Sequence, residues 1–236
     1  MDSQELLQAY NAGERNFSGL TLLELELLKL DLSDANFSQA DLRQSRLGRT
    51  HFCRNNFERC NLSESILWGS DLRNSNLKNA QLRETDLSSA LLSYANLEQA
   101  NLVKASLCGA NLNNANLANA RLIEADFRSN ADQRTDLGDA NLSQADLSYA
   151  LLSGVILRGA NLAQAVLCRA KLGKDYRPGS FSTDLSKVNL QGADLSYADL
   201  TGVNLKEANL TGADLTGTLL HQANLNHAIK IGRAHV

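Results

Sequence analysis

The sequence predicts an all-β solenoid, a narrow coil made of short extended segments joined by tight corners. A Leu or Phe stands at every fifth position from Phe17 to Leu172 except at Asp132, and the pattern resumes from Leu185 to Leu225. A small residue, most often Ala, lies two positions before each of these, commonly with Asn or Asp in between. Internal repetition of this kind is typical of stacked, repetitive architectures.

A period of five fits neither a continuous helix nor a continuous strand. On a helix, each step of five rotates by about 140°, so the leucines would form no apolar stripe. On a strand, an odd step sends successive leucines to opposite faces. We therefore expect the chain to turn once per repeat, with the small and central residues inward and the next two at a corner. The expected core includes these leucines: Leu42, Leu97, Leu112, Leu147, Leu195 and Leu210.

The repeats resemble the pentapeptide-repeat family, whose signature A(D/N)LXX occurs here as ADL at 40–42, ANL at 110–112 and ADL at 193–195. The resemblance implies a right-handed quadrilateral β-helix over residues 15–229. Four repeats would make one coil, and about ten coils would stack at the spacing of neighbouring strands.

The two ends depart from the repeat. Residues 1–14 are expected to form a capping helix, which would span 3–12 with Ser3 as its N-cap and Gly13 as its stop. Residues 230–236 form a tail, and 231–236 correspond to one reading frame of a common sequencing adapter. We exclude these last residues from fold reasoning as a suspected artefact.

Two irregular segments, 128–136 and 173–184, interrupt the solenoid. Asp132 occupies a central position in the first, which we expect to bulge outward, and both should lie on one edge about 10 Å apart. They are either tolerated insertions or functional loops on a rigid scaffold. Together with the exposed Trp68, they supply the candidate partner-binding residues: Arg128, Asn130, Asp132, Gln133, Arg134, Tyr176 and Arg177.

Composition excludes several classes of function. The net charge of −3 lacks the basic footprint of a nucleic-acid binder. No apolar stretch is long enough to span a bilayer and no signal peptide is evident, so we expect a cytoplasmic protein that contacts neither membrane nor nucleic acid directly. The four cysteines show no metal-ligand spacing and are expected to be free thiols: Cys53, Cys60, Cys108 and Cys168.

No catalytic constellation is recognisable, so we expect a protein without enzymatic activity, cofactor or metal. The histidines outside the tail fall on outward or corner positions: His51, His221 and His227. A locally basic band on the early repeats either solubilises the chain or contacts phosphate or an acidic partner. It consists of His51 and five arginines: Arg43, Arg46, Arg49, Arg54 and Arg59.

Four segments are similar to cyanobacterial pentapeptide-repeat proteins that control heterocyst differentiation: SILWGSDL (65–72), KASLCGANLN (104–113), NADQRTDLG (130–138) and LQGADLSYA (190–198). This similarity implies a role in controlling cell differentiation by binding other regulatory proteins, and we expect the chain to be a monomer or a weak homodimer. The alternative is a DNA-mimicking protein that binds a topoisomerase such as gyrase and protects it from quinolones. Duplex mimicry requires a strongly acidic surface, which the charge balance does not favour.

Overall fold

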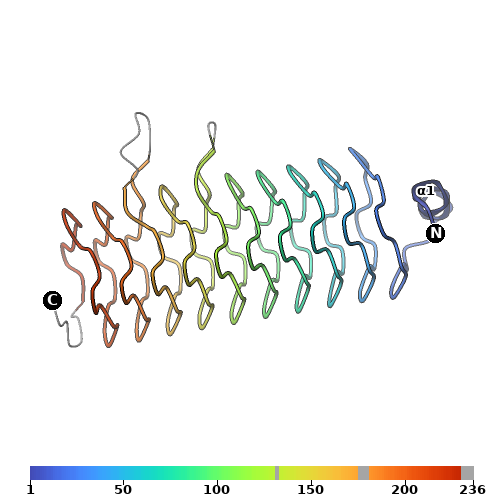
Figure 1. Ribbon diagram of the computed structural model, residues 1–236. Helices are drawn as coiled ribbons and strands as arrows, with labels where there is room; N and C mark the ends of the chain where they lie inside the picture. The colour runs from blue at the N-terminus through green and yellow to red at the C-terminus, as the bar shows by residue number, and fades with distance from the viewer. Residues whose placement is uncertain (131–132, 175–180, 230–236) are drawn as a thin grey trace.

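A computed structural model describes residues 1–130, 133–174 and 181–229. The helix α1 spans Ser3–Asn11. The described chain beyond it winds into stacked coils that form an elongated β-helix (Figure 1). Isolated parallel bridges join each coil to the next, and in the regular part each bridge pairs residues 20 positions apart.

The bridges form four columns, one on each face of the β-helix. Face 1 starts at Asn16–Asn36, face 2 at Thr21–Asp41, face 3 at Glu26–Arg46 and face 4 at Asp31–His51. Because four repeats of five residues complete one coil, each corner also recurs every 20 residues and stacks on its equivalents.

The interior is filled by the central Leu and Phe residues and the small residues before them. The six leucines expected in the core are all at most 2% exposed. Three aromatic rings stack along face 1, with centroids 5.2 Å apart for Phe17 and Phe37 and 5.4 Å apart for Phe37 and Phe57. The hydrophobic residues therefore form one continuous core along the rod.

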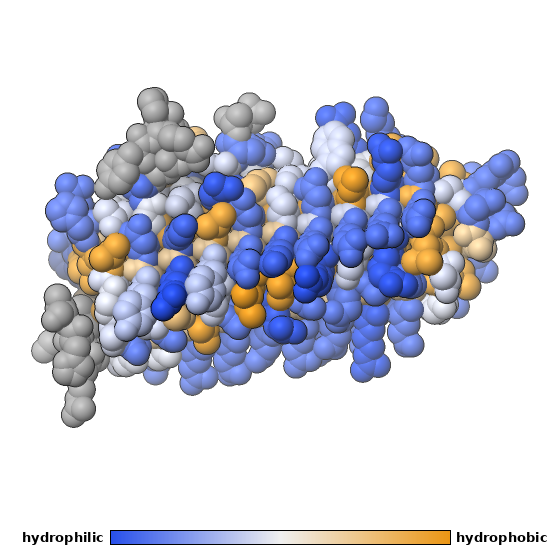
Figure 2. Space-filling view, in the orientation of Figure 1, coloured by the Kyte–Doolittle hydropathy of each residue, from blue (hydrophilic) through white to orange (hydrophobic). Residues whose placement is uncertain are grey.

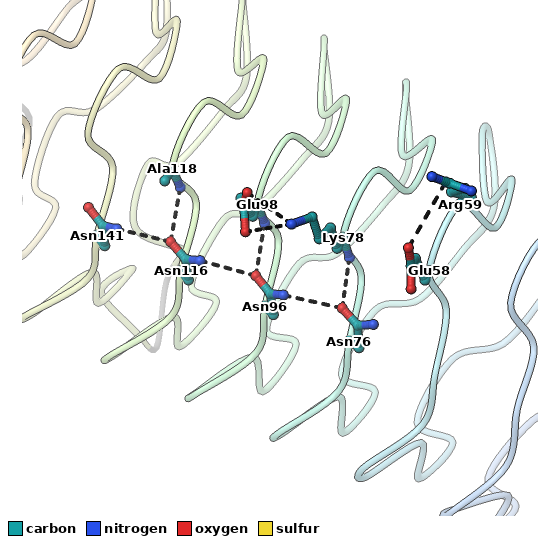
Figure 3. A network of polar contacts seen from close by, with 9 residues as sticks. All are labelled: Glu58, Arg59, Asn76, Lys78, Asn96, Glu98, Asn116, Ala118 and Asn141. Carbon is teal, nitrogen blue, oxygen red and sulfur yellow. Dashed lines mark hydrogen bonds and ion pairs between the residues drawn. The ribbon is translucent and has the colours of Figure 1, made fainter.

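Each regular corner turns the chain onto the next face within two residues, and the second of these has a positive φ, as at Lys29 (58°) and Tyr94 (60°). Outside the core, an amide ladder follows face 1. Each Asn Nδ2 donates to the Asn Oδ1 of the preceding coil, at 3.3 Å from Asn96 to Asn76 and 3.1 Å from Asn116 to Asn96 (Figure 3). These bonds satisfy the outward polar groups between coils.

The helix α1 packs on the first coil, where Leu6 is fully buried. The expected N-cap was wrong: Asp2 caps the helix through a capping box with Glu5, rather than Ser3. The Ser3 hydroxyl instead accepts a hydrogen bond from the Glu26 backbone N–H at 3.0 Å. Tyr10 adds a second tie by donating its hydroxyl to the Ser33 carbonyl at 2.9 Å.

Candidate partner-binding edge

Both irregular segments leave the β-helix at the corner between face 3 and face 4, which we call the loop edge (Figure 1). The first follows Asp126 and the second follows Lys171. Bridges connect Asp126 to Leu151 and Leu151 to Lys171, so the two departures are two coils apart. The single corner between them contains Gly154.

The coil lengths show how many residues each segment inserts. Bridges such as Asn111–Asp136 span 25 residues, so the first loop adds five residues to a coil. Ile156–Asp184 spans 28, so the second adds eight. Asp132, which holds the repeat position in the sequence and was expected in an outward bulge, lies outside the described residues. The buried centres on either side of it are Phe127 and Leu137, so the insertion amounts to one repeat between two consecutive coil centres.

A buried threonine ends each loop at the inward position that Ala usually occupies. Thr135 Oγ1 accepts from the Gly109 N–H at 2.8 Å, and Thr183 Oγ1 accepts from the Gly154 N–H at 2.9 Å. Thr183 also donates to the Leu172 carbonyl at 2.6 Å. Each threonine thus ties the returning chain to the coil below.

Arg134 connects the two loops. Its Nε donates to the Gly154 carbonyl at 2.9 Å, one terminal nitrogen donates to the Ser182 carbonyl at 2.7 Å, and its guanidinium lies 5.1 Å from the Phe181 ring centroid. Burial lowers the pKa of Arg134 from its ordinary value. Because its donors face inward to backbone carbonyls, Arg134 holds the loops together more than it faces a partner.

Two other predicted partner-binding residues of the first loop, Arg128 and Asn130, contact the surface of the coils. Arg128 forms an ion pair with Asp126 at 2.7 Å. Asn130 covers Gly109, donates to Ser89 Oγ at 2.9 Å and accepts from the Gln133 N–H at 2.7 Å. Three further candidates lie outside the described residues: Asp132, Tyr176 and Arg177.

Trp68 shares this edge, three coils before the first loop. Its indole covers the bare backbone of Gly48, where a Cβ would come within 2.7 Å of the indole nitrogen. The Arg49 guanidinium lies 4.4 Å from the ring centroid, and the side chain remains 39% exposed. Gly48 therefore makes room for a flat, partly exposed aromatic surface.

The predicted basic band does not form one patch. Its residues occupy successive faces and corners of the early coils, so they encircle the rod. Arg43 pairs with Asp41 and Arg54 with Asp34, which leaves fewer cations free than the sequence suggested.

One polar cluster went unnoticed in the sequence. On face 4, His51 Nδ1 lies 3.7 Å from Asp71 Oδ2, and Arg73 pairs with the same carboxylate at 2.6 Å. Burial raises the pKa of Asp71, but hydrogen bonds from Arg73 and the Cys53 thiol outweigh it and lower the pKa to about 2. Stepping by 20 from His51 would have found the pair.

This cluster lacks an activated nucleophile. Burial, together with the hydrogen bond to Asp71, raises the pKa of the Cys53 thiol, so the thiol stays protonated. All four cysteines are free. Among the described residues, no group of three or more His, Cys, Asp or Glu side chains could hold a metal ion.

The apolar residues of the displayed surface and the described helix supply no second candidate functional site. On the face displayed in Figure 2, hydrophobic residues are scattered among hydrophilic ones. A shallow hollow near Gly138 and Gly159 is lined by both acidic and basic groups, including Asp139 and Arg158. No helix in the described parts of the chain could cross a membrane.

Comparison with known proteins identifies the family. A family model for pentapeptide repeats matches in eight copies, over residues 31–69, 56–93, 90–128, 135–173 and 183–222. The chain belongs to the pentapeptide-repeat family. This confirms the resemblance drawn from the A(D/N)LXX pattern. No curated protein sequence matches the chain.

Two solved pentapeptide-repeat structures are informative. HetL from the cyanobacterium Nostoc sp. strain PCC 7120, described as involved in heterocyst differentiation regulation, is 50% identical, with a TM-score of 0.97 over 100% of both chains. The plasmid-mediated fluoroquinolone resistance protein QnrB1, in a trypsin-treated variant form, is 22% identical with a TM-score of 0.63. That match covers 76% of this chain and 86% of QnrB1, so QnrB1 supports the fold alone.

Proposed function

We propose that this chain is a non-enzymatic, cytoplasmic regulator of heterocyst differentiation that acts by binding other regulatory proteins. The supporting observation is the similarity to HetL, which extends over both whole chains at 50% identity. A rigid β-helix with a solid core suits this role because it presents surface features at fixed positions without a reaction cleft.

The loop edge is the proposed contact surface. It carries the two departures from the repeat and the exposed Trp68. Elsewhere the corners repeat similar two-residue turns, whereas here Arg134 joins the two loops into one feature. Loops held on a rigid scaffold are common sites of recognition.

The test is expression in a heterocyst-forming filamentous cyanobacterium. Overexpression of the wild-type chain is expected to change the frequency of heterocysts relative to an empty vector. A Trp68→Ala variant should lose most of this effect, whereas Arg121→Ala, on face 2, should keep it. An unchanged heterocyst frequency with stably expressed wild-type protein would contradict the proposed function.

DNA mimicry, with binding to a topoisomerase such as gyrase, is the second candidate, and the elongated rod of stacked coils is the observation in its favour. A mimic of duplex DNA needs a continuous acidic stripe. On face 4 the outward acids are interspersed with apolar residues, as at Asp71, Leu91, Asp136 and Ile156. We therefore expect no inhibition of gyrase in a supercoiling assay, and inhibition at micromolar protein would favour this candidate instead.

The regular part of the molecule serves as scaffold in this proposal. We infer about ten coils from the 20-residue coil and the length of the repeat region, residues 15–229. The helix α1 would close the first coil, because its buried Leu6 and its bonds to Glu26 and Ser33 of that coil cover the apolar end.

A further inference from the structure

A row of exposed side chains follows the corner between face 2 and face 3, one corner away from the loop edge. The bridges Asp146–Val166 and Val166–Asp194 join three successive coils, and the second corner residue of each coil comes three positions later. These corner residues are Tyr149, Arg169 and Tyr197. The last two are separated by the 28-residue coil, so counting by 20 in the sequence would not have placed them in one row.

The three side chains form a stack that we call the tyrosine ladder: Tyr149, Arg169 and Tyr197. The Arg169 guanidinium lies 5.9 Å from the Tyr149 ring centroid and 5.6 Å from the Tyr197 ring centroid. Both distances are within the range of cation–π attraction. The two tyrosines are 49% and 59% exposed, so much of each ring is open to a partner. Tyr197 also covers the bare backbone of Gly217, where a Cβ would come within 2.6 Å of the ring.

Arg169 keeps its side-chain donors for a partner. In the described parts of the chain its guanidinium has no hydrogen-bond or ion-pair partner, whereas Arg43 and Arg128 each pair with an Asp of their own corner. A guanidinium carries five N–H donors in a fixed plane. The ladder therefore places an ordered group of donors between two flat aromatic surfaces.

This combination suits a proline-rich segment in the polyproline II conformation. Such a segment rises about 3.1 Å per residue with three residues per turn, so one turn advances about 9 Å. Two coil steps separate Tyr149 from Tyr197, which corresponds to about 9.6 Å at the strand spacing. Two prolines one turn apart would therefore each pack on one ring. Their backbone carbonyls have no internal hydrogen bonds, so a carbonyl between them is able to accept from Arg169.

The charges beside the ladder favour a basic residue next to the prolines. Asp146 and Asp194 lie on face 2 in the coils of the two tyrosines, and neither forms an ion pair within the described residues. Their Oδ1 atoms accept from the backbone N–H groups of Ser148 and Ser196, which leaves the second oxygens for a cation. The same carboxylates would repel the phosphates of single-stranded nucleic acid, which also stacks on aromatic side chains.

We propose that the tyrosine ladder binds a proline-rich segment of a partner protein, with a proline on each tyrosine ring, a peptide carbonyl on Arg169 and a flanking Lys or Arg beside Asp146 or Asp194. This is a second contact surface, separate from the loop edge, and it does not depend on the role in heterocyst differentiation. A polyproline II ligand is already ordered before it binds, so a small exposed surface is sufficient to recognise it.

The experiment measures fluorescence anisotropy with labelled probes. Decaproline followed by two arginines is the test probe. A Gly-Ser peptide of the same length with the same arginines, decaproline without arginines, and deca-thymidylate are the comparison probes. We expect the test probe to bind and the Gly-Ser peptide to bind at least about tenfold more weakly, because it lacks apolar rings and pays a larger ordering cost.

Tyr149→Asn/Tyr197→Asn should weaken binding of the test probe by about fivefold or more, as truncation of aromatic contact residues commonly does. Asn already occupies this repeat position with a positive φ at Asn74. The matched control is Tyr94→Asn, which removes a 63% exposed ring from the same repeat position at another corner. This control should bind like the wild type, and circular dichroism would verify that all variants are folded.

Asp146→Asn/Asp194→Asn should weaken the test probe but leave decaproline without arginines unchanged. Equal binding of the proline and Gly-Ser probes, no binding of the test probe, or equal weakening by Tyr94→Asn would overturn the proposal. Preferential binding of deca-thymidylate would replace the proline-rich segment with single-stranded nucleic acid. Because no probe involves heterocyst formation, failure here would leave the proposed function intact.

Discussion

The residue two positions before each central Leu or Phe points inward and decides how its coil contacts the preceding coil. Ala fills most of these positions, where a fully buried methyl leaves no polar group to satisfy. Asn55 shows the polar solution: its Oδ1 accepts from the Ala35 N–H at 2.9 Å and its Nδ2 donates to the Leu32 carbonyl at 2.9 Å. No buried side-chain nitrogen or oxygen lacks a partner in the described residues. Thr135 and Thr183 apply the same solution where the loops return.

Thr183→Val should destabilise the chain because it leaves the Gly154 N–H without its acceptor. Leaving a buried donor unpaired costs about 1–3 kcal/mol. Urea unfolding would measure this loss. Thr218→Val is the control, since that hydroxyl donates to the Leu195 carbonyl and accepts from no backbone N–H of the described residues. Equal losses for the two variants would contradict this role of Thr183.

Asp71 should make stability depend on acid. Its folded pKa of about 2 is below the ordinary value, so the ionised carboxylate stabilises the fold at neutral pH. That contribution is fully present above the unfolded pKa and is lost as pH falls through about 2. The melting-temperature advantage of the wild type over Asp71→Asn should therefore shrink in strong acid. An advantage independent of pH would contradict this assignment.

At the scale of elements, the helix and the loops are joined to the β-helix by a few specific bonds. The helix α1 begins at a capping box between Asp2 and Glu5 and is tied to the coils through Ser3 and Tyr10. The two loops are joined through Arg134. The contacts of helix α1 and of Arg134 each involve only a few residues. A substitution at one of them should therefore loosen the helix or a loop without unfolding the β-helix.

Arg134→Ala should loosen the second loop. The variant loses the bond to the Ser182 carbonyl and the contact with the Phe181 ring. We expect chymotrypsin to cleave after Phe181 several-fold faster while the main melting transition is nearly unchanged. Arg134→Lys should not restore protection, because one ammonium cannot reproduce the planar, multiply donating guanidinium. The control Arg158→Ala should cleave like the wild type, and equal cleavage of Arg134→Ala would contradict the connection.

At the scale of the whole molecule, stability is shared between neighbouring coils, as in other solenoids. Each coil contacts mainly the coils before and after it, because the bridges join successive turns. A defect in the middle therefore weakens two interfaces, whereas one at the end weakens a single, partly exposed one.

Leu112→Asp should unfold the central coils. Leu112 is fully buried, so the change removes about 1.5–3 kcal/mol of burial and adds the cost of a buried carboxyl. Leu225→Asp, at a partly buried end position, should lower the melting temperature much less. Circular dichroism during heating would compare them, and equal melting temperatures would contradict the inward register of Leu112.

The sequence determined the local geometry, since a period of five with a small residue two positions earlier permits few conformations other than a turning coil. Face and interior positions such as Leu112 and Asn116 could therefore be assigned by counting. The helix boundary was nearly correct, although Ser3 was wrongly chosen as N-cap. The Asp2–Glu5 spacing of a capping box, which is readable in the local sequence, was overlooked.

The placement of both irregular segments on one edge, two coils apart, was predicted from the repeat count and is confirmed by the bridges from Asp126 to Leu151 and from Leu151 to Lys171. Only the tertiary structure decided which side chains join the two segments. Arg134 bonds to the Ser182 carbonyl and Thr183 accepts from the Gly154 N–H, contacts that local sequence does not indicate. The five-residue repeat follows from local steric constraints, so it can be predicted from the order of residues. Side-chain contacts between coils depend on which residues are stacked, and insertions change that stacking.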